Sequence, residues 1–387
     1  MLHNPFQYGS PVDAEHFAGR ARELKALTSR MADGINVVLV SPRRYGKTSL
    51  LLRAEDQLGR SGAAIVHADI LRCASPAELA AKLAGEAFRL PSGRWHRVKD
   101  SVSEFVRRLK VSPSVVFRPD GSPQFSFAGD LAGRDVHQVL EDIYALLAGE
   151  APRRPGVLVL DEFQAITDLD DHLPGVLKAL SDSYSRVSLV LAGSQRHLME
   201  RLTGSTGAPL YGMAEPLALG PVGTADMVAY LRRQAENAGK PMNVEVAGLV
   251  IDVAGPIPND IQRLAYSAYE AAEGPIDAGD VYEGMEEVTF HGDATYADAY
   301  LRFSPGQRRV LRTLAAHPQG EVFSARFARD VQLANAASVR KAVDALRAAE
   351  VISQEGEVWK VADPFLRYWL NWLLGAVAQH VRSKETP

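Results

Sequence analysis

The chain is poor in cysteine and in long apolar runs. Of its 387 residues only Cys73 is a cysteine, which excludes an internal disulfide and suits a reducing compartment. No apolar run approaches membrane-spanning length, and the N-terminus lacks the basic-then-apolar pattern of a signal peptide. The ten histidines show no metal-ligand spacing, and no Ser/His/Asp arrangement is legible. These absences predict a cytoplasmic protein that makes no membrane contact. The length of the chain is sufficient for two or three domains.

The most informative stretch is residues 41–48, SPRRYGKT, which lies between the apolar run 37–40 and the apolar helix start 49–52. A strand, a tight loop and a helix form a phosphate cradle, because loop N–H groups and the helix N-terminus both attract anions. In this pattern Lys47 reaches the β- and γ-phosphates and the Thr48 hydroxyl binds Mg²⁺. The alternative is a chance basic turn. We predict a nucleotide-phosphate site made by Arg43, Arg44, Tyr45, Gly46, Lys47, Thr48 and Ser49.

One position departs from the G-x-x-x-x-G-K-[ST] pattern. Ser41 stands where the first glycine is expected. The departure matters only if that backbone needs a positive φ, which serine adopts poorly.

Two further apolar runs end in polar residues. Residues 156–160 read as a buried parallel strand that ends in Asp161 and Glu162. At the carboxyl end of such a strand Asp161 would serve Mg²⁺ and Glu162 would polarise the attacking water. Residues 187–192 read as a third strand, after which Ser194 would sense the γ-phosphate. For Ser194 an ordinary turn is an equal alternative.

The second half of the chain predicts helices. Helices over 224–238, 244–254 and 259–272 form an all-α piece that would close over the nucleotide as a lid. Residues 304–361 read as three helices, over 307–316, 323–329 and 337–350, followed by a strand, a tight turn and a strand. That order is a winged helix. In the first half, residues 91–135 have a looser pattern, within which 115–117 and 125–127 predict a hairpin.

Charge is distributed unevenly. From Arg302 onward there are 13 Lys and Arg against 8 Asp and Glu, a net of +5, whereas the preceding part has a net of −9. Any contact with duplex DNA is therefore expected at the C-terminus, from Arg340, Lys341 and Arg347 on the third helix. A winged helix used only for protein packing is about as well supported, because Glu355 and Glu357 lie in the wing.

Several stretches together resemble archaeal-type ATPases, which are AAA+-like P-loop proteins close to the STAND switch ATPases and more distantly similar to origin-recognition ATPases. The stretches are residues 4–6, 17–20, 23–24, 41–50, 159–164, 191–194, 209–212, 255–262 and 363–369. The resemblance implies a parallel sheet in which the Asp161–Glu162 strand lies next but one to the phosphate-loop strand. It also implies that residues 6–12 and 17–20, including Gly19 and Arg20, line the adenine pocket, and that Pro258 faces the nucleotide from the lid.

One departure from the family bears on catalysis. Met213 stands where the family usually has an arginine after glycine. If that arginine supplies positive charge to a γ-phosphate, this chain lacks it and should hydrolyse ATP slowly when isolated. The alternative is that Arg186 or Arg201 has taken over the role, in which case turnover is ordinary.

The sequence thus predicts an α/β P-loop domain over 1–220, a helical lid over 221–300 and a winged-helix domain with a C-terminal helix over 301–387. It predicts an ATP-hydrolysing, Mg²⁺-dependent switch or motor that acts with DNA, a protein partner or further copies of itself. The first alternative is a non-hydrolysing, nucleotide-gated scaffold. A small-molecule kinase is disfavoured because such an enzyme has no use for a winged-helix domain.

Overall fold

The computed structural model describes residues 4–88, 90, 114–117, 123–126, 136–150 and 156–384. Its internal contacts separate two units, Pro11–Pro221 on one hand and Met1–Ser10 with Val222–Pro387 on the other. We call them the sheet unit and the helical unit. The first ten residues thus group with the C-terminal part of the chain rather than with the sheet. The predicted boundary between lid and winged helix, near residue 300, stays a prediction.

The sheet unit is built on five parallel strands in the order β2-β5-β6-β1-β7. The strands are β1 (Val37–Val40), β2 (Ile65–Asp69), β5 (Gly156–Asp161), β6 (Val187–Gly193) and β7 (Glu215–Ala218). Every residue of β5 and β6 is buried, as expected of parallel strands covered on both faces. Strand β6 separates β5 from β1, so the predicted position of the Asp161–Glu162 strand, next but one to the phosphate-loop strand, is confirmed.

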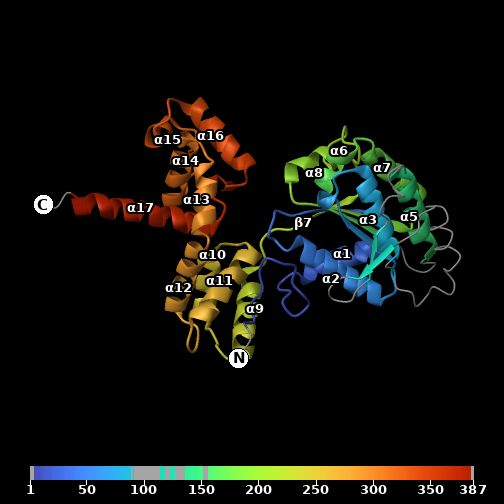
Figure 1. Ribbon diagram of the computed structural model, residues 1–387, viewed down its shortest axis with the longest axis horizontal. Helices are drawn as coiled ribbons and strands as arrows, with labels where there is room; N and C mark the ends of the chain where they lie inside the picture. The colour runs from blue at the N-terminus through green and yellow to red at the C-terminus, as the bar shows by residue number, and fades with distance from the viewer. Residues whose placement is uncertain are drawn as a thin grey trace. The chain divides into compact units, whose positions relative to one another are not determined.

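Helices cover both faces of this sheet (Figure 1). Alternate residues of β5 show the division, because Val157 and Val159 pack with α1 and α2, whereas Leu158 and Leu160 pack with α3, α5 and α7. The helices of the unit are α1 (Ala21–Ala32), α2 (Lys47–Arg60), α3 (Pro76–Phe88), α5 (Val136–Glu150), α6 (Ile166–Leu169), α7 (Leu173–Ser183) and α8 (Arg196–Thr203).

The hairpin predicted in the looser region is present. Strands β3 (Ser114–Phe117) and β4 (Pro123–Ser126) pair antiparallel in a separate two-stranded sheet. The expected turn at 118–122, the strand end Phe127 and the remainder of 91–135 lie outside the described residues.

The helical unit contains the three predicted lid helices and two that were not predicted. Helices α9 (Thr224–Asn237), α10 (Val244–Ala254) and α11 (Pro258–Ala271) agree with prediction, and α12 (Ala278–His291) and α13 (Asp293–Leu301) follow them. Helices α11 and α12 pack closely at Gly284, where a Cβ would lie 2.6 Å from the Ala268 amide nitrogen.

The winged-helix order is confirmed. It consists of α14 (Pro305–Ala316), α15 (Ala325–Asp330), α16 (Ala336–Ala348) and the hairpin β8 (Ile352–Glu355) and β9 (Val358–Val361). Val339, Val343 and Leu346 of α16 are fully buried, as their spacing predicts. Helix α17 (Pro364–Lys384) then closes the chain. No helix among the described residues is both long and apolar enough to cross a bilayer.

Candidate functional site

The phosphate loop has the backbone that its sequence requires. Two of its residues have positive φ, Arg44 at 70° and Gly46 at 84°. Ser41 does not, so the serine in place of glycine introduces no strain there. Ser41 is buried and its N–H donates to the Gly193 carbonyl at 3.1 Å, which ties the loop to the end of β6. Helix α2 starts at Lys47 directly after the left-handed Gly46, as a phosphate-binding helix N-terminus requires.

The structure brings the predicted lysine, threonine and two acids together. Lys47 forms an ion pair with Asp161, and its Nζ lies 3.0 Å from Glu162 Oε1. The Thr48 hydroxyl donates to Asp161 Oδ2 at 3.3 Å. Lys47 and Asp161 are 6% and 4% exposed, so the pair is shielded from water. The meeting follows from the topology, because β1, β6 and β5 are parallel and their carboxyl ends share one sheet edge.

The backbone and side chain of Glu162 are held in an unusual position. The residue adopts a left-handed conformation with φ 52°, and its N–H donates to Asp161 Oδ1 at 2.8 Å. The Ser194 hydroxyl donates to Glu162 Oε2 at 2.8 Å. Burial alone would raise the pKa of this carboxyl, but the charge of Lys47 and the hydrogen bonds from Gln164, Lys47 and Ser194 outweigh it and lower the pKa. Glu162 is therefore an ionised carboxylate at neutral pH.

Gln164 is a member of the site that we did not predict. It lies in the short turn η3 (Phe163–Ala165), and its amide donates to Glu162 Oε2 at 2.5 Å. The readable signal was an amide residue two positions beyond the acids, between the apolar Phe163 and Ala165.

Arg20 and Ser49 make hydrogen bonds that connect the phosphate loop and the start of α2 to neighbouring backbone. The Arg20 guanidinium donates to the carbonyls of Tyr45 and Gly220 and pairs with Glu23. The Ser49 hydroxyl accepts the Val12 N–H at 3.1 Å. These contacts fix the loop ends. Direct contacts of Gly19, Arg20, Arg43, Arg44, Tyr45 and Ser49 with a nucleotide stay predictions.

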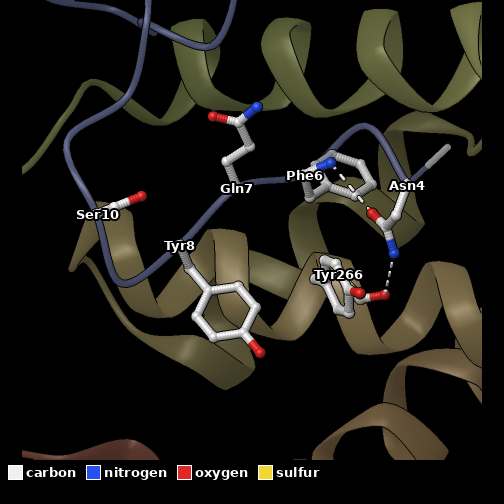
Figure 2. Close-up of a pocket in the computed structure, with 6 residues that line it drawn as sticks. All are labelled: Asn4, Phe6, Gln7, Tyr8, Ser10 and Tyr266. Atoms are coloured by element: carbon white, nitrogen blue, oxygen red, sulfur yellow. Dashed lines mark hydrogen bonds between the residues drawn. The ribbon is translucent and has the colours of Figure 1, made fainter. Parts of the chain in front are cut away.

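The N-terminal segment forms a small pocket within the helical unit (Figure 2). The Asn4 amide donates to the Tyr266 carbonyl at 3.0 Å and to Glu270 at 2.7 Å, and Phe6 is 2% exposed. The pocket has a volume of about 290 Å³ and is lined by Asn4, Phe6, Gln7, Tyr8, Ser10 and Tyr266. Pro258 is the first residue of α11 in the same unit. The predicted places of Pro258 and residues 6–12 beside an adenine stay predictions.

One of the two candidate replacement arginines is at the wrong edge of the sheet. Arg186 immediately precedes β6, whereas Ser194 follows it, and seven strand residues span about 23 Å. Arg186 therefore does not reach a phosphate held by its own chain's loop. Arg201 lies exposed on α8, and Met213 is partly buried against the core.

The three predicted basic residues of α16 are exposed, and two of them lie over aromatic rings. The guanidinium of Arg340 lies 4.5 Å from the Phe323 ring centroid, and that of Arg347 lies 6.0 Å from the Trp359 ring centroid. These cation–π contacts lie on one face of α16, seven residues apart. In the wing, Lys360 pairs with Glu355 at 2.6 Å, which offsets one of the two acids there.

Comparisons with known proteins agree with this architecture. A family described as a probable winged helix domain matches residues 294–372. The Walker-type ATPase PABY2304 of Pyrococcus abyssi is 16% identical, with a TM-score of 0.67 over 95% of this chain and 99% of that one. The ORC2 protein of Aeropyrum pernix, solved in ADPNP–ADP complexes, is 13% identical, with a TM-score of 0.56 over 97% and 99%.

These likenesses show the fold. The chain has a P-loop ATPase fold with a parallel sheet and a C-terminal winged helix, as the resemblance in the sequence implied. No curated protein matches the sequence.

Proposed function

We propose that the chain binds ATP and hydrolyses it with Mg²⁺, as a switch or motor of the AAA+ and STAND type. The observation that carries the proposal is the convergence of Lys47, Thr48, Asp161 and Glu162 at one sheet edge, beside a loop with the backbone of a phosphate cradle. Two structural neighbours support it, since one is titled a Walker-type ATPase and the other was solved with ADPNP and ADP.

The donor set fits Mg²⁺. The Thr48 hydroxyl and an Asp161 carboxylate oxygen, 3.3 Å apart, are the hard oxygen ligands that Mg²⁺ takes, with phosphates and waters completing its shell. Among the described residues no group of three or more His, Cys, Asp and Glu side chains is placed to hold a metal alone, which agrees with a metal that arrives with a nucleotide. Bound there, Mg²⁺ would neutralise charge on the β- and γ-oxygens.

Each side chain then has a task. Lys47 exchanges part of its pairing with the acids for the phosphate oxygens. Glu162, ionised because its pKa is lowered, orients the attacking water and accepts its proton. Ser194, whose hydroxyl donates to Glu162, links that carboxylate to the end of β6, where it senses the γ-phosphate.

The test is turnover and binding by the purified full chain. We expect Mg²⁺-dependent release of phosphate from ATP, abolished by EDTA. Glu162→Gln should bind ATP as tightly as the wild type and hydrolyse it at least about 100-fold more slowly, because it lacks the base. Equal turnover by both proteins would show that Glu162 takes no part in hydrolysis.

A DNA contact through α16 is the second part of the proposal. Arg340, Lys341 and Arg347 are exposed on this helix, and the two arginines lie over aromatic rings. Binding of duplex DNA that weakens as salt rises would support it, because lysine and arginine release counterions from phosphates.

The alternative, a non-hydrolysing scaffold that acts through protein partners, is favoured by one surface of the helical unit. Residues 264–301 contain nine Asp and Glu and no Lys or Arg. On this acidic segment Phe290 is 45% exposed, and it contacts Trp372 of α17, which is 44% exposed. Exposed aromatic pairs of this kind are typical of protein interfaces. ATP-dependent partner binding by a protein that does not hydrolyse ATP would decide for the scaffold.

A further inference from the structure

The amide of Gln164 bridges the ends of two neighbouring strands. Its Nε2 donates to Glu162 Oε2 at 2.5 Å and to the Ser194 hydroxyl at 3.3 Å, and its Oε1 accepts the Ser194 N–H at 3.3 Å. Gln164 is 5% exposed, so these bonds form away from bulk water. Both ends of one side chain therefore connect the acid after β5 to the serine after β6.

The neighbouring Gly193 leaves room for this side chain. A Cβ at Gly193 would lie 2.7 Å from Gln164 Oε1 and would also collide with Met199. Gly193 does not have a positive φ, so its backbone conformation does not require glycine. The missing side chain instead opens the slot that Gln164 fills.

The chemistry at both ends requires an amide. The Glu162 carboxylate only accepts hydrogen bonds and the Ser194 backbone N–H only donates, so the group between them must donate on one side and accept on the other. Among side chains of this length, only glutamine does both without a charge. A glutamate here would place a second carboxylate against Glu162, and a methionine would fill the space without either bond.

The left-handed backbone of Glu162 makes this support necessary. A non-glycine residue at φ 52° is in a strained conformation and keeps it only where its surroundings impose it. Lys47 also holds the carboxylate, but the same ammonium is the group that reaches the phosphates. While Lys47 contacts a triphosphate, Gln164 and Ser194 are the neutral donors that keep Glu162 in place.

We infer that Gln164 is a positioning residue for hydrolysis, which holds the Glu162 carboxylate toward the end of β6 where the attacking water must lie. The inference rests on the proposed ATPase function. It assigns to Gln164 an effect on the chemical step and little effect on nucleotide binding.

The experiment compares the full-length wild type with Gln164→Met, which keeps the side-chain volume, and with Gln57→Met, the same change at an exposed glutamine on α2. For Gln164→Met we expect kcat to fall about 10- to 100-fold, the loss typical of one hydrogen bond to a charged group, with KM and ADP affinity within about 3-fold. Gln57→Met should behave as wild type.

If Gln164→Met does not fold, Gln164→Asn provides a second test. It keeps the amide but is one methylene shorter, so it cannot span both partners and should also lose turnover without losing ADP binding. Wild-type kcat in either folded variant overturns the inference while leaving the ATPase intact. A wild type that binds ATP without hydrolysing it overturns the proposed function, and this inference with it.

Discussion

Replacing Lys47 should destabilise the sheet unit as well as remove a phosphate ligand. Its ammonium pairs with Asp161 and Glu162, whose side chains are 6% and 20% exposed. Removing one member of a buried ion pair costs about 3–5 kcal/mol of unfolding free energy, since the other charge stays buried without compensation. The Gln164 and Ser194 donors to Glu162 remain, so we expect the low end, about 3 kcal/mol, for Lys47→Met.

The loss should depend on pH with a definite sign. In the wild type the pKa of Glu162 lies below its ordinary 4.5, so its pairing stabilises the fold above that pH and is lost as pH falls through the lowered pKa. Without Lys47, the charge that lowers the pKa of Glu162 is gone while burial still raises it, so this pKa rises relative to the wild type. Protonation then relieves the penalty in acid, so Lys47→Met should be less destabilising at pH 5 than at pH 8.

Thermal unfolding of nucleotide-free protein in EDTA measures both effects, because bound ligand would hide them. About 3 kcal/mol corresponds to a Tm lower by about 6–12 °C in a unit of roughly 150–250 residues. Lys25→Met, which removes an exposed lysine from α1, is the control and should change stability by less than about 0.5 kcal/mol. Adding Glu162→Gln to Lys47→Met should recover part of the loss. Equal Tm values for the two lysine variants at both pH values would refute the buried pairing.

Three further predictions concern other parts of the chain. Isolated wild-type protein should hydrolyse ATP slowly, because an arginine finger is typically worth about 10³–10⁵ in rate. If Arg201 supplies the finger to a neighbouring copy, Arg201→Ala should slow hydrolysis further. Fast hydrolysis that is unchanged in Arg201→Ala would contradict both expectations. His67→Gln should cost more stability at pH 6 than at pH 8.5. Burial would lower the pKa of His67, but Glu55, whose Oε1 lies 2.8 Å from His67 Nδ1, raises it together with Asp161 and Glu86. The ion pair of His67 and Glu55 therefore stabilises the fold below the ordinary pKa of 6.5, and this stabilisation is lost as pH rises through the raised pKa. Changing Arg340, Lys341 and Arg347 together to alanine should lower the slope of log K against log salt for duplex DNA by about 2–3, and an unchanged slope would remove α16 from the interface.

The elements best predicted from the sequence are those whose signal is local. Strands β1, β5 and β6 are runs of mostly apolar residues, and each ends near the residues that meet at the site. Strand β7 was missed because it is an exposed edge strand that contains Pro216. Helix α12 was missed because small or polar residues such as Gly284 and Thr289 occupy buried positions, although its capping box of Asp277 and Asp280 was readable.

The residues that sequence reasoning could not place depend on tertiary geometry. The direction of the Gln164 side chain follows from the left-handed turn at Glu162 and from the slot beside Gly193, and neither is visible in the pattern of residue types. Likewise, the stacking of Arg340 and Arg347 depends on Phe323 and Trp359, which come from other parts of the winged helix.

The pairing of the N-terminal segment with α11 sets an order of events during synthesis on the ribosome. Asn4 bonds Tyr266 and Glu270, which follow it by 262 and 266 residues. At about 5–20 residues per second, Phe6 waits on the order of 10–50 s for the helix that buries it. The whole of Pro11–Pro221 emerges in that time and can fold first. Docking of residues 4–10 is thus a late step, and a bulky group fused directly before Asn4 should delay completion of the helical unit more than folding of the sheet.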